Sequence, residues 1–70
     1  MTDIVAPMSG NIWKILVKEG DKVSEDDEII IMEAMKMEIP VTATVDGVLK
    51  SLKVQEGDPV EANDSLAEIE

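Results

Sequence analysis

The chain repeats itself at a fixed spacing. Gly10 and Gly47 are 47 − 10 = 37 residues apart, and Glu19-Gly20-Asp21 aligns at the same spacing, without a gap, with Glu56-Gly57-Asp58. Apolar residues also recur at equivalent positions in both copies. A repeat this short cannot bury an apolar face alone. We therefore expect the two copies to interlock into one domain, residues 1–70, with approximate two-fold symmetry.

Each copy has the pattern of short β-strands separated by turns. Its apolar runs are rich in β-branched residues, and Gly and Asp at the turns supply positive φ and a side-chain acceptor. No segment has the apolar period of about 3.6 residues that predicts a helix. The pattern predicts an all-β sandwich or barrel with Val23 and Val60 in its core. The expected strands are Asp3–Ala6, Asn11–Lys18, Glu28–Met32, Ile39–Val45, Val48–Gln55 and Leu66–Glu70.

The alternation of apolar and polar residues breaks in the second expected strand. Ile12, Ile15 and Val17 are not separated by single residues throughout, and the second copy has the same break. A β-bulge or a sharp bend accounts for such a break. Trp13 lies inside it and aligns with Lys50 of the other copy. We expect Trp13 to be half exposed, and an ordinary surface aromatic is favoured over a partner contact.

A hairpin is predicted at the middle of the chain. With Met35-Lys36 as a two-residue turn, the facing pairs are Ala34/Met37, Glu33/Glu38 and Met32/Ile39. This register is self-consistent because it places an apolar set on one face. That set is Ile30, Met32, Ala34, Met37, Ile39 and Val41.

The hairpin contains two unfavourable local features. Two-residue turns prefer Asn-Gly or Asp-Gly because both central residues take positive φ, and Met35-Lys36 in such a turn is strained by about 1–3 kcal/mol. Glu33 and Glu38 repel across the strands. Local rules broken at one point indicate function, so the exposed amine of Lys36 becomes the candidate site. We expect both chain ends at the opposite pole.

The composition excludes several kinds of function. Seventy residues leave little room for a substrate cleft, and the absence of Cys and His removes thiol chemistry, imidazole bases and the common zinc sites. With 16 acidic and 6 basic residues, the net charge of −10 disfavours nucleic-acid binding and favours a soluble monomer. No apolar run is long enough to span a membrane. Without a secretory signal at Met1-Thr2-Asp3, the expected location is the cytoplasm.

Other motifs have simpler interpretations. The run Glu25-Asp26-Asp27-Glu28 lacks the alternating ligands and central glycine of a calcium loop, so a solvated loop is expected and no metal site. Glu-Gly-Asp, present twice, is interpreted as turn chemistry. The glycines fit no phosphate-binding loop. Exposed Glu33 and Glu38 lack the pocket that acid–base catalysis needs, so no catalytic residue is predicted.

Glu33-Ala34-Met35-Lys36-Met37 resembles the attachment motif of biotinyl domains, the biotin carboxyl carrier family. The resemblance extends through Ala6-Pro7-Met8-Ser9-Gly10, residues 17–23 and Asp46-Gly47, and so covers nearly the whole chain. It is especially close to the small stand-alone biotin/lipoyl attachment proteins. Lipoyl domains share the fold but usually carry Asp-Lys-Ala at this point, so Met-Lys-Met favours biotin.

The resemblance implies a flattened barrel of two four-stranded antiparallel sheets and an amide bond between Lys36 Nζ and the biotin carboxylate. A biotin protein ligase would form this bond through biotinyl-adenylate. Glu33, Ala34, Met35 and Met37 would then be recognition positions for the ligase and partner enzymes. The chain itself would catalyse nothing, and would shuttle a carboxyl group from a biotin carboxylase to a carboxyltransferase.

Two other functions remain open from the sequence alone. Lys36 could carry lipoate instead of biotin, or it could accept both acids, on the same scaffold. The chain could instead be an unmodified β-domain that binds a partner through its hairpin. An enzyme is the least favoured class, and neither the acceptor substrate nor the larger assembly leaves a trace in the residues.

Overall fold

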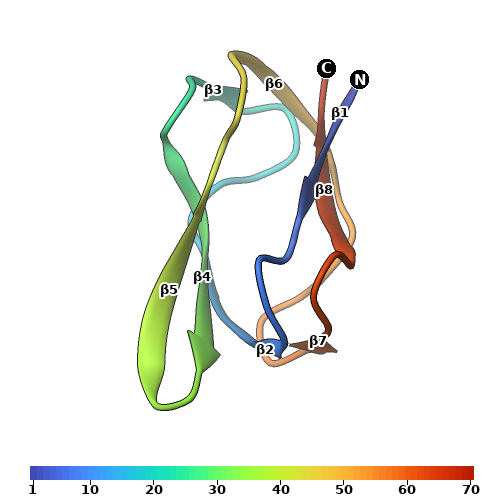
Figure 1. Cartoon of the computed structure of the whole chain (residues 1–70). Coiled ribbons are helices and arrows are strands. Elements are labelled where there is room, and N and C mark those ends of the chain that lie inside the picture. The colour runs from blue at the N-terminus through green and yellow to red at the C-terminus, as the bar shows by residue number, and fades with distance from the viewer.

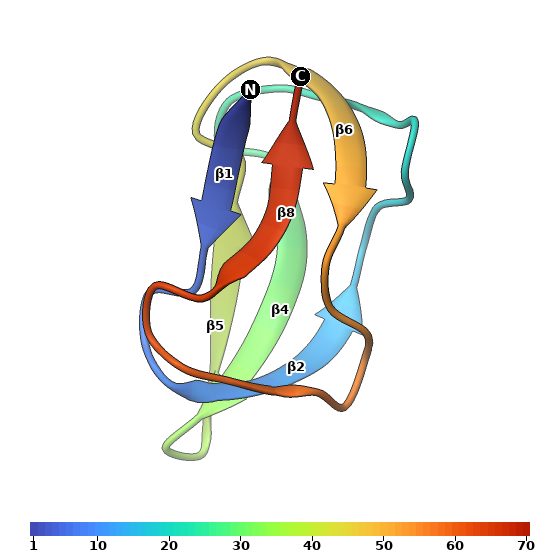
Figure 2. The same ribbon diagram turned by 90° about the vertical axis from the view of Figure 1, so that its right-hand side faces the viewer.

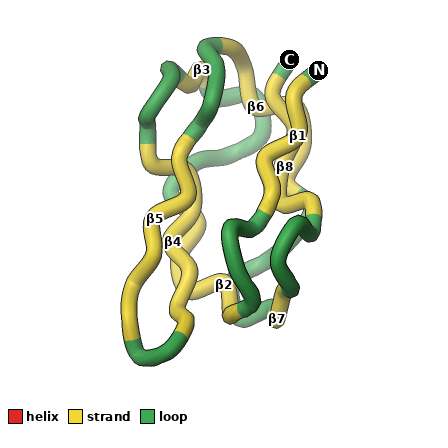
Figure 3. The backbone as a smooth tube through the Cα atoms, viewed as in Figure 1, coloured by secondary structure: helices red, strands yellow, loops and turns green.

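The computed structural model describes residues 1–70 and contains eight strands and no helix (Figures 1 and 3). It therefore contains no helix that could cross a membrane. The strands are β1 (Thr2–Val5), β2 (Gly10–Ile15), β3 (Lys22–Val23), β4 (Glu28–Ala34), β5 (Met37–Thr42), β6 (Gly47–Leu52), β7 (Pro59–Val60) and β8 (Ser65–Ile69).

The strands form two antiparallel four-stranded sheets, which confirms the expected fold class. Their strand orders are β1-β8-β6-β3 and β5-β4-β2-β7. Each sheet takes two strands from each repeat, so the two copies interlock as predicted. The β4–β5 hairpin extends beyond the rest of the molecule at one end, and the two termini lie together at the other end (Figures 1 and 2).

The two-fold symmetry is followed closely by the backbone. Strands β2 and β6 have equivalent bounds, since 10 + 37 = 47 and 15 + 37 = 52. Gly57 N–H donates to the Ile12 carbonyl at 2.7 Å, and Gly20 N–H donates to the Leu49 carbonyl at 2.8 Å. Each half thus supplies donors that satisfy carbonyls of the other half, as buried backbone groups require.

Carboxylates make the same exchange between the halves. Ile15 N–H donates to Glu56 Oε2 at 3.1 Å, and Leu52 N–H donates to Glu19 Oε2 at 2.9 Å. The donors are equivalent (15 + 37 = 52), and so are the acceptors (19 + 37 = 56). The second and third residues of each Glu-Gly-Asp make the predicted turn. Gly20 has a φ of 95°, and Asp21 Oδ2 accepts from Lys18 N–H at 2.9 Å.

These contacts correct the predicted strand ends. We expected strands to Lys18 and Gln55, but β2 ends at Ile15 and β6 at Leu52. At Ile15 and Leu52 a carboxylate from the other half accepts the backbone N–H. Leu16 and Lys53 each donate one more N–H to a carbonyl of the neighbouring strand before the chain leaves the sheet. Strand β5 likewise ends at Thr42 and not at Val45, because Ala43 N–H donates to the Asp27 carbonyl in a loop.

The core between the sheets is entirely apolar. All 15 buried residues are hydrophobic, and the predicted Val23 and Val60 are among them. The largest fully buried side chains are Ile12, Ile29, Ile30, Met32, Leu49, Leu66 and Ile69. Burying such side chains is the main stabilising term in a domain of this size. The predicted bulge is present in both copies, between Ile12 and Lys14 and between Leu49 and Ser51.

One ion pair is present on the surface. Lys53 Nζ lies 2.9 Å from Glu68 Oε1. The hydrogen bond to Glu68 raises the pKa of Lys53, and the hydrogen bond from Lys53 lowers the pKa of Glu68 below its ordinary 4.5. Glu68 therefore adds stability above its ordinary pKa, and this contribution is lost as the pH falls through the lowered value. Exposure to solvent keeps the contribution small.

The close approach at Gly47 generates a stability prediction. A Cβ there would overlap the Glu70 carbonyl oxygen and lie 2.7 Å from Ile69 Cγ2. Gly47→Ala should therefore lower the free energy of unfolding by about 1–3 kcal/mol, the usual cost of overpacking. Urea unfolding measures this loss. Lys50→Ala, an exposed change in the same strand, is the control and should stay within about 0.5 kcal/mol of wild type. Equal effects of the two substitutions would contradict the packing argument.

Candidate functional site

The hairpin has the predicted register. Strands β4 and β5 pair antiparallel, and Met35-Lys36 is the two-residue connection between them. The observed facing pairs include Met32/Ile39, Glu33/Glu38 and Ala34/Met37. Figure 1 shows this turn as the lowest point of the molecule, farthest from the termini. The sequence therefore predicted both the turn residues and the pairing that positions them.

The turn has the strained backbone that the sequence predicts. Met35 has a φ of 53° and Lys36 a φ of 64°, both in the left-handed region. The other non-glycine residues with positive φ are Asp26 and Asn63, which occupy equivalent repeat positions. Asp and Asn tolerate this region because a short polar side chain can bond locally. Met and Lys lack that relief, so the strain concentrates at the hairpin tip.

The side chains at the tip are open to solvent. Lys36 is exposed, Met35 is 83% exposed and Met37 is 64% exposed. No hydrogen bond or ion pair involves Lys36, so its amine is free. These methionines place exposed apolar surface on both sides of the lysine. The tip thus presents a primary amine on a flexible stem between two adaptable apolar side chains.

Charged and polar groups lie directly behind the tip. Glu33 and Glu38 are both exposed and face each other, as predicted, and Asn11 of β2 is the partner of Glu33 on its other side. They flank the turn on the outer face of the sheet, because they alternate along the strands with Ala34 and Met37, which lie on the opposite face. A partner approaching Lys36 along this face meets an acidic pair.

Ala34 occupies a different environment from the other candidate recognition residues. It is only 6% exposed, so little of its side chain is available to a partner. A Cβ built on Gly10 would lie 2.9 Å from Ala34 Cβ and 2.6 Å from the Glu33 carbonyl oxygen. Gly10 therefore allows β2 to approach the base of the hairpin closely. Sequence reasoning did not assign this role to Gly10, although its recurrence as Gly47 was a usable signal.

The molecule has no pocket, and no three carboxylates come close enough together to hold a metal ion. Pro40 lies on β5, the edge strand of its sheet, where the absence of a backbone N–H removes no hydrogen bond between strands. This arrangement can present an attached group to other proteins.

Comparisons with known proteins agree with this picture. The family model described as "Biotin-requiring enzyme" matches residues 2–69. The chain is 47% identical over 62 residues to a biotin/lipoyl attachment protein of Bacillus subtilis, covering 89% of this chain and 85% of that protein. It is 45% identical over 64 residues to a biotin carboxyl carrier protein of Streptococcus mutans, covering 91% of this chain and 49% of that protein.

A solved structure shows the same fold inside a much larger protein. The urea carboxylase of Kluyveromyces lactis matches with a TM-score of 0.92 and 38% identity. The match covers 97% of this chain and 6% of the carboxylase. The chain thus spans most of the attachment protein, about half of the carrier protein and a small part of the carboxylase.

The strain at the tip can be tested by substitution. Met35→Asn should raise the free energy of unfolding by up to about 1 kcal/mol, because Asn tolerates positive φ. Met37→Asn is the matched control, since Met37 is an exposed strand residue outside the turn, and it should give no gain. Urea unfolding of both variants measures the difference. If Met35→Asn is no more stable than wild type, the turn is not strained at this residue.

Proposed function

We propose that this chain, which belongs to the biotin/lipoyl attachment family, is a biotin carboxyl carrier whose attachment residue is Lys36. The observation that carries the proposal is the free, exposed amine at the tip of a strained two-residue turn. A chain built only for stability would place Asn-Gly there. A chain that must present an amine to other proteins gains from a protruding lysine.

The residues at the tip fit covalent attachment of biotin. The Lys36 amine is unpaired, so forming an amide with the biotin carboxylate breaks no interaction in the domain. Once attached, biotin supplies a ureido nitrogen that can hold a carboxyl group. The lysine stem and the biotin chain together span about ten bonds, a reach of roughly 12 Å. Within that reach, tethering replaces diffusion by a high local concentration.

The neighbouring residues have separate roles in this proposal. Met35 and Met37 offer the exposed apolar contacts by which a biotin protein ligase would hold the tip. Glu33 would contact the ligase from the outer face of β4. Ala34 contributes to recognition indirectly: its small buried side chain lets the base of the hairpin pack against β2, which fixes the shape of the tip. Ligase recognition then depends on a preformed shape together with three exposed side chains.

The proposed partners follow from the chemistry of a carrier. The ligase attaches biotin, a biotin carboxylase loads the carboxyl group with ATP and bicarbonate, and a carboxyltransferase unloads it onto an acceptor. The domain contributes no catalytic group of its own to these steps. Relatives that are carriers or parts of carboxylases support this division of labour.

Lipoate on Lys36 is the second candidate. The name of the Bacillus subtilis relative covers biotin and lipoate together, and this similarity supports the candidate. The biotin carboxyl carrier relative and the Met-Lys-Met tip favour biotin. The mass of the adduct on the native protein distinguishes the two acids.

Lys36→Arg tests the attachment residue. Arginine keeps the charge and the exposed position but lacks a primary amine, so the fold should persist and biotin incorporation should disappear. The assay is streptavidin blotting and intact mass after co-expression with a biotin protein ligase. Lys14→Arg is the control and should be labelled like wild type. Wild-type labelling of Lys36→Arg would refute the assignment.

Glu33→Gln tests recognition separately from stability. Glu33 faces Glu38, so its neutralisation removes a repulsion and should leave the domain at least as stable. The initial rate of biotinylation by the ligase should nevertheless fall about threefold or more, from the loss of one charged contact. Glu70→Gln is the matched control, because Glu70 is the repeat equivalent of Glu33 (33 + 37 = 70). Equal rates for the two variants would remove Glu33 from the recognition surface.

A further inference from the structure

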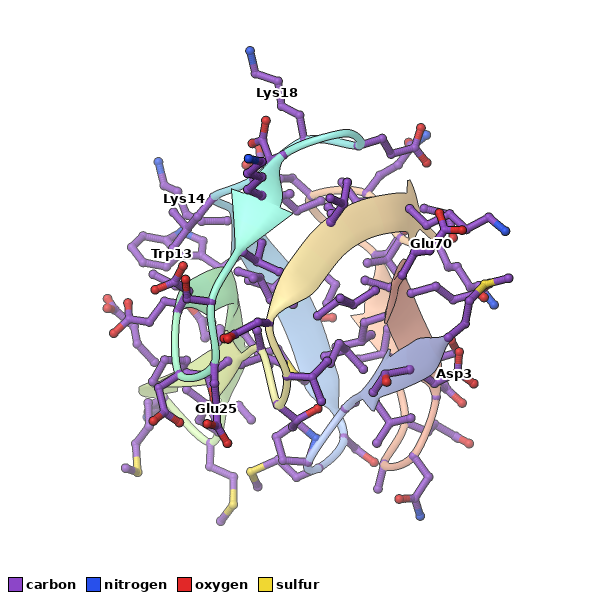
Figure 4. All side chains as sticks on the ribbon, turned by 90° about the horizontal axis from the view of Figure 1, so that it is seen from above. Asp3, Trp13, Lys14, Lys18, Glu25 and Glu70 are labelled. Carbon is purple, nitrogen blue, oxygen red and sulfur yellow. The ribbon has the colours of Figure 1, made fainter.

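The sulfur atoms of the chain differ sharply in their exposure to solvent. The chain contains five methionines and no cysteine, so all of its sulfur is thioether sulfur. Met32 is fully buried in the core, whereas Met35 is 83% exposed and Met37 is 64% exposed. Figure 4 shows sulfur atoms, in yellow, at the outer edge of the molecule. Two exposed thioethers therefore belong to the residues on either side of Lys36.

The backbone holds these two thioethers in the open. Ala34 pairs with Met37, and Met35-Lys36 closes the turn with positive φ at both residues. Behind the turn Ala34 is buried, and a Cβ built on Gly10 would lie 2.9 Å from Ala34 Cβ. The molecule has no pocket that could receive a methionine side chain. The folded hairpin thus offers neither side chain a buried position.

Exposed thioethers are the groups of this chain that a mild oxidant attacks most readily. No cysteine is present to react first, and hydrogen peroxide is uncharged, so the net charge of −10 does not repel it. Trp13 is 43% exposed, as expected from the sequence, but an indole needs a stronger oxidant than peroxide. Met32 is protected by its burial. Oxidation is therefore directed to the exposed methionines, and two of these flank the proposed attachment residue.

Oxidation at the tip changes its surface and leaves the fold intact. A methionine sulfoxide is polar, whereas the thioether is an adaptable apolar group. Met35 and Met37 lie outside the buried core cluster, so their oxidation removes no packing from the core. The change in polarity falls on the two positions next to the Lys36 amine. An enzyme that closes on this amine then meets polar groups where apolar ones were.

We propose that Met35 and Met37 form a reversible oxidation site, at which hydrogen peroxide converts the thioethers to sulfoxides and so hinders the attachment of biotin to Lys36; this inference rests on the proposed carrier function. In each step a sulfur lone pair attacks one peroxide oxygen, and the O–O bond breaks as the S–O bond forms. The proton of the transferred hydroxyl passes to the departing hydroxide, which leaves as water. The sulfur is oxidised by two electrons and the peroxide is reduced by two. A methionine sulfoxide reductase reverses the step with two electrons from a dithiol and releases the oxygen as water.

The biotin protein ligase is the enzyme whose reaction this site controls. The ligase makes the amide at Lys36 Nζ, so its active site must close on the two residues bonded to Lys36. Enzymes that act on the biotin ring work at the far end of an arm of roughly 12 Å and can reach the ring without covering the turn. Sulfoxides at the tip should thus slow the attachment of biotin and spare chains that already carry it.

Peroxide treatment of the chain before biotin is attached tests this inference. Hydrogen peroxide is added and then removed with catalase, and mass spectrometry of peptides locates each sulfoxide. The initial rate of biotin attachment is measured with a biotin protein ligase, ATP and biotin. Sulfoxide should form at Met35 and Met37 while Met32 stays unmodified, and the rate should fall about tenfold because two apolar contacts become polar. Methionine sulfoxide reductases specific for the two sulfoxide epimers should together restore the rate.

Leucine variants separate the tip from the other sulfur atoms. Leucine is apolar and forms no sulfoxide, so the double variant Met35→Leu/Met37→Leu should have the same rate before and after peroxide, whatever its untreated rate. Met8→Leu is the control, because it keeps both tip methionines, and its rate should fall as in wild type. Urea unfolding of peroxide-treated wild type should match that of the untreated protein, since the core is not modified.

Three results would overturn the inference. One is a wild-type rate within about twofold of the untreated rate after both tip methionines are oxidised. The second is an equal loss of rate in the double leucine variant, and the third is a loss of peroxide sensitivity in Met8→Leu. If untreated wild type accepts no biotin on Lys36, the proposed function itself fails, and this inference fails with it.

Discussion

The structure depends on an exchange of hydrogen bonds between two copies of one sequence repeat. At the last residue of β2 and of β6, the backbone N–H finds its acceptor in a carboxylate from the opposite copy, Glu56 for Ile15 and Glu19 for Leu52. Gly57 and Gly20, which follow these glutamates in the sequence, donate their backbone N–H groups to carbonyls of the opposite copy. Neither copy can satisfy its own backbone alone, so the two halves must fold together.

Departures from this symmetry are the parts of the chain that the scaffold does not explain. The strained pair Met35-Lys36 lies where β4 of the first copy is joined to β5 of the second. Trp13 differs from Lys50 although both lie on the same bulged backbone. The repeat thus provides an internal reference for which residues serve folding. Trp13 is the exposed residue of β2 that this comparison leaves unexplained.

Features set by local pattern could be predicted from the sequence, and features set by distant residues could not. The hairpin register and the positive φ of Lys36 follow from neighbours a few residues away, so alternation and turn chemistry were sufficient. Strand β2 ends where Ile15 N–H donates to Glu56, a residue 41 positions away. Local pattern gives no sign of this contact, so the predicted strand continued to Lys18. Alternation placed Ala34 on the apolar face, but its close contact with Gly10 of another strand is not revealed by any local pattern.

The most direct test is the mass of the protein purified from its own source, followed by fragmentation that locates any adduct. The account predicts one biotin, joined with loss of water, on Lys36 and on none of the other five lysines. Native protein without an adduct, or with its adduct on a different lysine, would contradict the claim that the scaffold exists to present this amine.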